Sequence, residues 1–316
     1  MISLDKIKEA HKKIAPYVNA TPLMYSDFLS QNKTVKLKLE SLQITGSFKL
    51  RGALNKLLSL SEEQKNKGVV ACSTGNHGKG VAYAANVLGI KSTIYMSTMV
   101  PQYRKEAIEA LGAKVEIVGK NSDEADLYSR EISKKENITL IHPFDDEEII
   151  IGQGTIGLEM LKDFPEVDTV IIPTSGGGLT GGIALAIKLQ KPDVKIIAVS
   201  MARGPSMYES LKQGKPVDVE ELETLADCLG GSIGINNKYT FKIVKDTIDD
   251  FVLVDEDKIA EGIRLNFFEH RLVTEGAAAT SVMVVKDNLS TNLGKNIICL
   301  ICGGNIESKL FTKIIS

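Results

Sequence analysis

The feature that most constrains the fold is a regular alternation of apolar runs and amphipathic segments through the middle of the chain. Apolar runs predict strands at residues 68–72, 91–96, 114–118 and 139–141. Segments with helical spacing separate them, at residues 75–88, 102–111 and 122–135. Because strands that alternate with helices are joined by crossover connections, the pattern predicts a parallel sheet with helices on both faces.

The alternation restarts after a connection at residues 143–146. Here the pattern predicts helices at residues 152–163, 181–189, 255–269 and 275–286, and strands at residues 169–173, 194–199 and 296–302. A helix at residues 3–15 and a strand at residues 35–40 come first. We therefore predict an α/β fold of two doubly wound domains with a cleft between them. The small domain would span residues 68–145, and the large domain residues 1–67 and 146–316.

Composition narrows the class of protein and its partners. The chain has 316 residues, of which 43% are hydrophobic and 25% charged, and its net charge is −2. This balance gives no electrostatic reason to expect nucleic acid or a membrane surface as a partner. Residues 1–15 are charged throughout, and no apolar run reaches the ~18 residues of a membrane span. We therefore expect a cytoplasmic protein.

The four cysteines are too few for a disulfide framework in a chain of this length. Cys299 and Cys302 have the spacing of a metal-binding pair, but no second pair of cysteines accompanies them. The sequence therefore predicts no zinc site.

Lys49 stands out because it lies between Phe48 and Leu50 in an apolar stretch, with Gly52-Ala53 close behind. A lysine that only solvates the surface seldom has such neighbours. A desolvated lysine has a lowered pKa, which suits a nucleophilic amine. We therefore interpret Lys49 as a residue that forms an imine with a carbonyl cofactor.

A glycine-rich run follows the strand predicted at residues 169–173. It comprises Ser175, Gly176, Gly177, Gly178, Leu179, Thr180, Gly181 and Gly182. Backbone N–H groups without Cβ atoms nearby can approach an anion, and a helix N-terminus adds positive potential. A phosphate site is the natural interpretation. The run also matches G-x-G-x-x-G, but the following strand ends in Ser200 and not in the acidic residue that a dinucleotide site requires.

A second polar loop follows the strand predicted at residues 68–72. Its residues are Ser73, Thr74, Gly75, Asn76, His77 and Gly78. Two hydroxyls, an amide and the N–H groups at a helix start would suit a carboxylate. Ordinary helix capping is an equally good explanation of this loop taken alone, and a single histidine such as His77 is more often structural than catalytic.

These motifs occur in a familiar order. The Ser47–Ala53 stretch, the Ser73–Gly78 loop, the glycine-rich run and the C-terminal Cys302-Gly303-Gly304-Asn305 together resemble the threonine/serine dehydratase and serine racemase family. That family uses pyridoxal 5'-phosphate and has a fold related to the tryptophan synthase β chain (fold type II of pyridoxal-phosphate enzymes). The resemblance covers nearly the whole chain, and it implies that the predicted cleft holds the cofactor.

The resemblance also implies a role for each motif. Lys49 would form the imine, Phe48 would pack beside the pyridine ring, and Asn76 would bond the phenolic oxygen. Ser175, Gly176, Gly177, Gly178 and Leu179 would bind the phosphate, and Cys302 would face the pyridine nitrogen. The substrate carboxylate would be held by Ser73, Thr74, Gly75, Asn76 and His77, with Thr74 on the ring face opposite Lys49 as a second catalytic residue.

Some positions depart from the family pattern. Ser175 replaces the first of four glycines, and Thr74 stands where racemases have serine. Ser200 and Ser206 occupy positions where many members bind a divalent cation, so we expect no metal site. The stretches at residues 199–204 and 226–231 are similar to the β-hydroxyaspartate and hydroxyectoine-breakdown branch. In that branch Arg203 would bind an acidic side chain, although a solvent-facing arginine is the alternative.

The sequence thus predicts a pyridoxal-phosphate ammonia-lyase that dehydrates a small β-hydroxy amino acid. Threonine or serine is the broad substrate class, and 3-hydroxyaspartate or a hydroxyectoine-derived amino acid is the branch alternative. An amino acid racemase and a non-catalytic binding protein on the same fold remain the other hypotheses. The family implies a homodimer.

Overall fold

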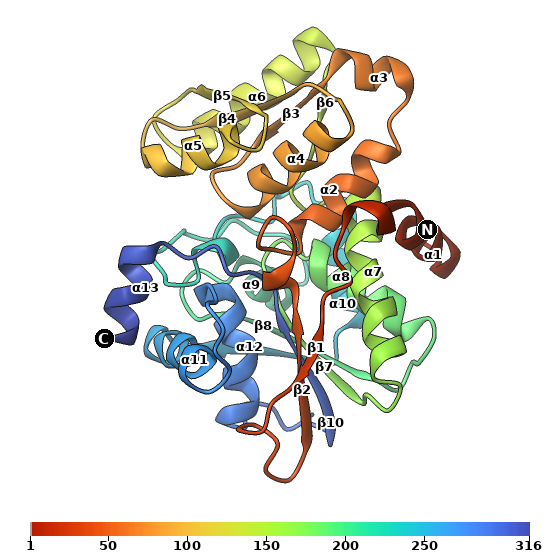
Figure 1. The fold of residues 1–316 in the computed structure, drawn as a ribbon, viewed down its shortest axis with the longest axis vertical. Coiled ribbons are helices and arrows are strands. Elements are labelled where there is room, and N and C mark those ends of the chain that lie inside the picture. The colour runs from red at the N-terminus through yellow and green to blue at the C-terminus, as the bar shows by residue number, and fades with distance from the viewer. Residues whose placement is uncertain (1) are drawn as a thin grey trace.

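The computed structural model describes residues 2–316, apart from the side chain of Ser122. It contains a four-stranded and a six-stranded sheet, which lie one above the other in Figure 1. The fold is the predicted α/β arrangement of two helix-covered sheets. In this part of the chain no helix is both long enough and apolar enough to cross a membrane.

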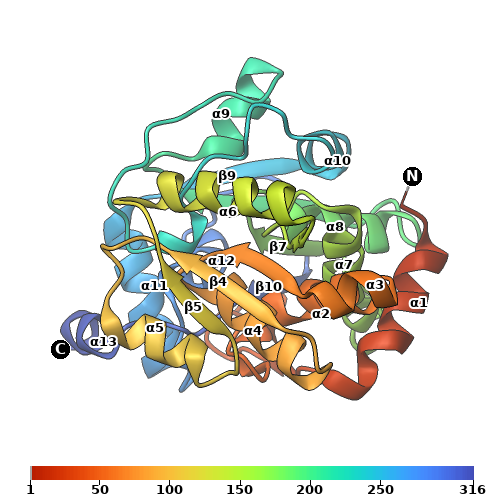
Figure 2. The same ribbon diagram turned by 90° about the horizontal axis from the view of Figure 1, so that it is seen from above.

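The smaller sheet is wholly parallel, in the order β5-β4-β3-β6. Its strands are β3 (Val69–Cys72), β4 (Ser92–Met96), β5 (Lys114–Ile117) and β6 (Thr139–Leu140). Helix α6 (Ser122–Glu136) covers one face, and helices α4 (Asn76–Val87) and α5 (Gln102–Glu109) cover the other (Figure 2). All four strands fall within residues 68–145.

The larger sheet has the order β1-β2-β10-β7-β8-β9, and only β1 is antiparallel to its neighbour. Its strands are β1 (Leu23–Tyr25), β2 (Thr34–Leu39), β7 (Thr169–Pro173), β8 (Lys195–Met201), β9 (Asp250–Val254) and β10 (Asn296–Ile301). Helices α7 (Glu147–Asp163) and α8 (Gly178–Lys188) lie on one side (Figure 1). Helices α11 (Glu256–Phe268) and α12 (Gly276–Lys286) lie on the other side.

The remaining helices lie around these layers. They are α1 (Leu4–Ile14), α2 (Lys49–Leu58), α3 (Glu62–Lys67), α9 (Ser206–Gln213), α10 (Thr240–Thr247) and α13 (Ser308–Ile315). Helix α2 lies between the two sheets (Figure 1). Its Leu50, Leu54 and Leu57 are fully buried in one apolar cluster with residues of the smaller sheet. On another side, Asn55 Nδ2 donates to the carbonyl oxygen of Glu148 on α7 at 2.8 Å. The predicted domain boundary at residue 68 stays a prediction.

Most predicted elements are present, with shifts that local chemistry explains. Helix α7 begins at Glu147 and not at residue 152, because the Asp146 carboxylate accepts hydrogen bonds from the N–H groups of Glu148 and Ile149. Helix α3 was not predicted, although Ser61 and Gln64 form a capping box there. Strands β1 and β9 and helices α10 and α13 are also additions to the prediction.

Candidate active site

Strand order brings the two predicted loops together. In the smaller sheet, β4 and β6 lie on opposite sides of β3, so the connections diverge at the end of β3. In the larger sheet, β8 and β10 lie on opposite sides of β7. Ligands of open α/β sheets bind where strand order reverses, at the carboxyl ends of the strands. The Ser73–Gly78 loop follows β3, and the glycine-rich run follows β7.

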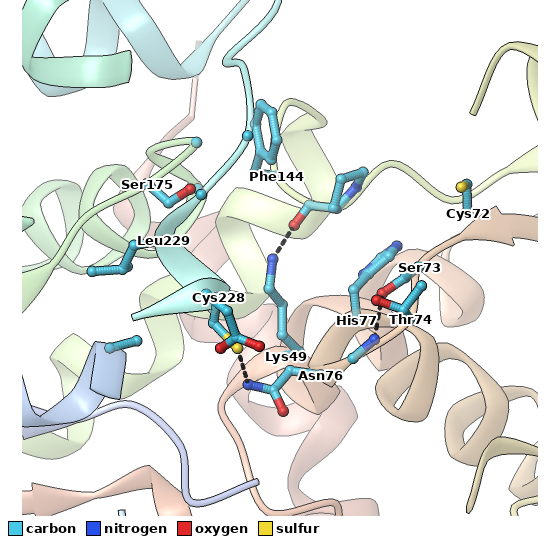
Figure 3. A pocket seen from close by; sticks show the side chains of 18 of the residues that line it. Lys49, Cys72, Ser73, Thr74, Asn76, His77, Phe144, Ser175, Cys228 and Leu229 are labelled. Atoms are coloured by element: carbon cyan, nitrogen blue, oxygen red, sulfur yellow. Dashed lines mark hydrogen bonds between the residues drawn. The ribbon is translucent and has the colours of Figure 1, made fainter. Parts of the chain in front are cut away.

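Both loops line one cavity of about 490 Å³ (Figure 3). Of the site residues predicted from the sequence, the cavity is lined by Phe48, Lys49, Ser73, Thr74, Gly75, Asn76, His77, Ser175, Gly176, Gly177, Gly178, Leu179 and Cys302. Lys49 lies between the Ser73–His77 loop and the side bearing Ser175 and Phe144 (Figure 3). The structure therefore gathers residues from distant parts of the chain around one lysine.

Lys49 is the first residue of α2 and is half-buried. Its Nζ donates a hydrogen bond to the carbonyl oxygen of Pro143 at 2.7 Å, and it lies 5.3 Å from the centre of the Phe48 ring. Burial lowers the pKa of Lys49 to about 8, against smaller opposing effects of Cys228, Cys302 and Glu275. Lys49 thus loses its proton more readily than an ordinary exposed lysine does.

The stretch before Lys49 is fixed to the C-terminal motif by the backbone. Ser47 forms an isolated antiparallel bridge with Gly303, and the N–H group of Phe48 donates to the carbonyl oxygen of Cys302 at 3.1 Å. Two motifs that are about 250 residues apart in the sequence are thereby joined beside the cavity.

The glycine-rich run forms a narrow cradle at the start of α8. A Cβ atom on Gly176 would lie 2.3 Å from the Phe144 ring, and one on Gly178 would lie 2.9 Å from the Phe144 carbonyl oxygen. Gly177 caps the helix with a φ angle of 85°, in the left-handed region that favours glycine. The first turn of a helix leaves its N–H groups without acceptors inside the helix, so they are available to an anion.

The Ser73–Gly78 loop has a similar position at the start of α4. Ser73 Oγ accepts a hydrogen bond from the N–H group of Gly75 at 3.3 Å, which shapes the turn. His77 is buried, and its Nε2 lies 2.9 Å from the Ile141 carbonyl oxygen. Burial, together with the charge of Lys49, lowers the pKa of His77 to about 3. His77 is therefore neutral at physiological pH and anchors the loop to the chain after β6.

Glu275 is a cavity residue that sequence reasoning missed. It is 2% exposed and precedes α12, and its carboxylate accepts two hydrogen bonds from Asn76 Nδ2, at 2.9 and 3.0 Å. Burial raises the pKa of Glu275 to about 7, although the Asn76 hydrogen bonds oppose the shift. Cys302 is also buried and donates from Sγ to Glu275 Oε1 at 3.9 Å. Burial raises the pKa of the Cys302 thiol, which therefore stays protonated.

Residues 142–144 line the cavity, although we predicted residues 143–146 only as a connection. His142 Nδ1 accepts hydrogen bonds from the N–H groups of Phe144 (3.3 Å) and Asp145 (2.8 Å). The Asp145 carboxylate in turn accepts from three N–H groups at the start of α10, at distances from 2.7 to 3.0 Å. The segment is thus held at both ends, with the Pro143 carbonyl oxygen directed at Lys49.

Arg203 is the one predicted site residue that the structure does not bring to the cavity. It is exposed, and its guanidinium donates to the carbonyl oxygen of Glu223 at 2.9 Å. Gly204, with a φ angle of 63°, turns the chain directly after it. The structure thus shows Arg203 bonded to the neighbouring loop, and its contact with an acidic substrate stays a prediction. Arg104 does line the cavity, but it already pairs with Asp227 at 3.2 Å.

These residues fit pyridoxal phosphate as the group that the sequence resemblance implies. A cradle without Cβ atoms at a helix N-terminus suits the phosphate, and a half-buried lysine with a lowered pKa suits the carbonyl. The cavity is also large enough for a small cofactor with a small substrate, since such pockets span roughly 300–1,000 Å³.

Comparison with known proteins agrees with this geometry. The family model described as pyridoxal-phosphate dependent enzyme matches residues 14–303. The L-threonine ammonia-lyase of Thermotoga maritima is 42% identical over 318 residues, covering 100% of this chain and 79% of that protein. The catabolic L-threonine dehydratase of Staphylococcus aureus (strain N315) is 42% identical over 313 residues, covering 97% and 90%.

A solved structure of maize serine racemase superposes with a TM-score of 0.92 at 31% identity, covering 98% of this chain and 96% of that one. The matches run through both sheets and all the loops that line the cavity. This chain therefore belongs to the family of pyridoxal-phosphate dependent enzymes.

Proposed function

We propose that this enzyme is a dehydratase (ammonia-lyase) that removes the β-hydroxyl group of a small amino acid, threonine or serine, to yield a keto acid and ammonia. The observation that carries the proposal is the gathering of Lys49, the Ser73–His77 loop and the glycine-rich run around one cavity. The similarity to an L-threonine ammonia-lyase over the full length of this chain supports the same reaction.

In this proposal the cofactor phosphate is held by the N–H groups of residues 175–179 at the start of α8. Phe48 packs beside the ring, Asn76 bonds its phenolic oxygen, and the neutral Cys302 thiol faces its nitrogen. When bound, the cofactor supplies an electron sink for the electron pair that remains at the substrate α-carbon.

Lys49 is the proposed base that removes the α-proton. A base works best when its pKa lies near the working pH, and burial brings the pKa of Lys49 to about 8. The Pro143 carbonyl oxygen lies within hydrogen-bond reach of its Nζ, so it would steady the ammonium that forms after proton transfer.

The substrate carboxylate is proposed to bind at the start of α4, among Ser73, Thr74, Gly75, Asn76 and His77. Because His77 is neutral and bonded to Ile141, it adds no charge to this loop. Thr74 lines the cavity and supplies a hydroxyl on the face that we assign opposite Lys49. If this hydroxyl delivered a proton to the substrate α-carbon, the enzyme would be a racemase. Racemisation is the second candidate function, and the similarity to maize serine racemase supports it.

An assay of keto acid and ammonia release tests the proposal. Threonine or serine should yield both products at equal rates, with little change in optical activity of the remaining substrate. Loss of optical activity without keto acid would favour the racemase. The assay should include both 3-hydroxyaspartate diastereomers and a hydroxylated diaminobutyrate, which represent the branch alternative.

Two arginine variants sharpen the substrate question. Because Arg203 lies outside the cavity, Arg203→Ala should leave kcat/KM for every substrate within about twofold. Arg104→Ala, the matched substitution at the cavity wall, should change the ratio of kcat/KM between neutral and acidic substrates. A selective loss of 3-hydroxyaspartate turnover in Arg203→Ala would instead support the predicted contact between Arg203 and an acidic side chain.

We also propose a cytoplasmic homodimer in which residues 68–145 act as the substrate-carboxylate domain and the rest as the cofactor domain. The family resemblance supports the dimer, and the four strands within residues 68–145 support the division. Sedimentation analysis would test the dimer, and limited proteolysis the boundaries.

A further inference from the structure

We propose that Lys79 is a positioning residue for the cofactor. A hydrogen-bond chain runs from its ammonium through Asn305 and Asn76 to Glu275, and it fixes the directions in which the oxygen and the nitrogen of the Asn76 amide point at the cavity. This inference rests on the proposed role of Asn76 in binding the cofactor oxygen.

The chain has three links. Lys79 Nζ donates to Asn305 Oδ1 at 2.9 Å, and Asn305 Nδ2 donates to Asn76 Oδ1 at 2.6 Å. Asn76 Nδ2 then donates to both oxygens of the Glu275 carboxylate, at 2.9 and 3.0 Å. Lys79 and Asn305 are half-buried, while Asn76 and Glu275 are buried.

The lysine end of the chain sets the direction of every link. A lysine ammonium only donates hydrogen bonds, so the Asn305 atom that faces it must be the oxygen. The Asn305 nitrogen must then face Asn76, where it meets the Asn76 oxygen. With its oxygen bonded to Asn305, the Asn76 amide turns its nitrogen to the Glu275 carboxyl group. Reversing either amide would place two acceptors or two donors in contact, and a buried mismatch of this kind is costly.

Two glycines make room for this chain: Gly46, directly before the Ser47–Ala53 stretch, and Gly303 of the C-terminal motif. A Cβ atom on Gly46 would lie 2.7 Å from Asn305 Oδ1, and one on Gly303 would lie 2.3 Å from Glu275 Oε1. Gly46 also has a φ angle of 76°. The chain is further secured where Asn305 Nδ2 donates to the Thr45 carbonyl oxygen at 2.9 Å.

The chain also crosses between the two sheets. Asn76 and Lys79 lie one turn apart on α4, beside the smaller sheet, whereas Asn305 follows β10 and Glu275 precedes α12 beside the larger sheet. Asn305 and Glu275, on the opposite wall, thus set the direction of the Asn76 amide. Because Lys79 orients Asn305, it acts on the cofactor through Asn305 and Asn76, although it does not line the cavity.

The test compares pyridoxal phosphate binding by the native protein, Lys79→Met, Lys79→Arg and Lys188→Met, using absorbance titration of cofactor-free protein. Lys79→Met cannot donate, so we expect about tenfold weaker binding, the equivalent of one hydrogen bond. A shifted absorption maximum of the bound cofactor should accompany it. Lys79→Arg is also a pure donor and should retain both affinity and spectrum.

Lys188→Met is the control for a merely structural loss, because Lys188 is half-buried and pairs with Asp249 at 2.8 Å on the far end of α8. It should lower the Tm of the cofactor-free protein without changing the spectrum of the bound cofactor. Native affinity and spectrum in Lys79→Met would overturn the inference, and so would an Arg variant as weak as the Met variant. If the native protein did not bind pyridoxal phosphate at all, the proposed function itself would fail.

Discussion

The chemistry of single residues here is governed by burial. Lys49 begins helix α2, where the positive end of the helix dipole disfavours its charged form. This effect lowers the pKa of Lys49, as burial does. In the same cavity, burial keeps a proton on Cys302 and raises the pKa of Glu275 to about 7. The cavity therefore holds a lysine that readily loses its proton beside acids that readily keep theirs.

Glu275 gives a stability prediction with a defined sign. Its pKa rises from an ordinary value of 4.5 to about 7 in the folded protein, so between these values the folded chain holds a proton that the unfolded chain releases. The free energy of unfolding should therefore fall as pH rises from 5 to 8, by roughly 1–3 kcal/mol from this group. Glu275→Gln should remove that contribution.

Urea unfolding of the cofactor-free native protein and of Glu275→Gln at pH 5 and pH 8 measures this difference. If both proteins show the same dependence on pH, Glu275 does not titrate in this range.

Among the elements, the glycine-rich run before α8 shows how packing limits sequence. Gly176 faces the ring of Phe144, which belongs to the segment that directs the Pro143 carbonyl oxygen at Lys49. The run is therefore the proposed phosphate cradle on one side and a packing surface on the other.

Gly176→Ala should disturb both functions, since its Cβ atom would lie 2.3 Å from the Phe144 ring. We expect at least tenfold weaker binding of pyridoxal phosphate, measured by absorbance titration. Phe144→Ala in the same protein should recover part of the lost affinity, because it removes the clash. Undiminished binding in Gly176→Ala would show that the cradle is not used.

Helices and strands were predicted where a hydrophobic repeat extends over many residues. They were missed where the element is short or has no apolar stripe. Helix α3 has no buried residue, so no apolar stripe marks it. Strand β9 has five residues between helices α10 and α11, and β1 has only three residues. The loops of the site were found because glycines and small polar residues after a strand have a physical meaning. Glu275 was missed because a glutamate at the start of a predicted helix is ordinary, and only the tertiary fold brings it to Asn76.

At the scale of the whole molecule, a buried cluster of four charges joins the elements that hold Lys49 in place. Arg51 is fully buried and forms ion pairs with Glu40 at 2.9 Å and with Glu159 on α7 at 2.6 Å. Lys38 on β2 pairs with the same Glu159 at 2.6 Å. The cluster is electrically balanced, and it ties α2 to β2 and α7.

Arg51→Met should lower the free energy of unfolding by about 3–5 kcal/mol, because it leaves the Glu40 and Glu159 carboxylates buried without their main partner. Denaturant unfolding of the cofactor-free protein checks this value. Adding Glu40→Met should restore part of the loss, since it removes one of the stranded charges. A single variant within 1 kcal/mol of the native protein would mean that Arg51 does not support the fold.

The account as a whole rests on the bond between Lys49 and the cofactor. The most direct measurement is mass spectrometry of peptides after the enzyme is loaded with pyridoxal phosphate and reduced with borohydride. We predict that the added mass lies on Lys49 alone, and that Lys49→Ala loses both the label and the release of keto acid. A label on another lysine, or a Lys49→Ala enzyme that keeps its activity, would contradict the account.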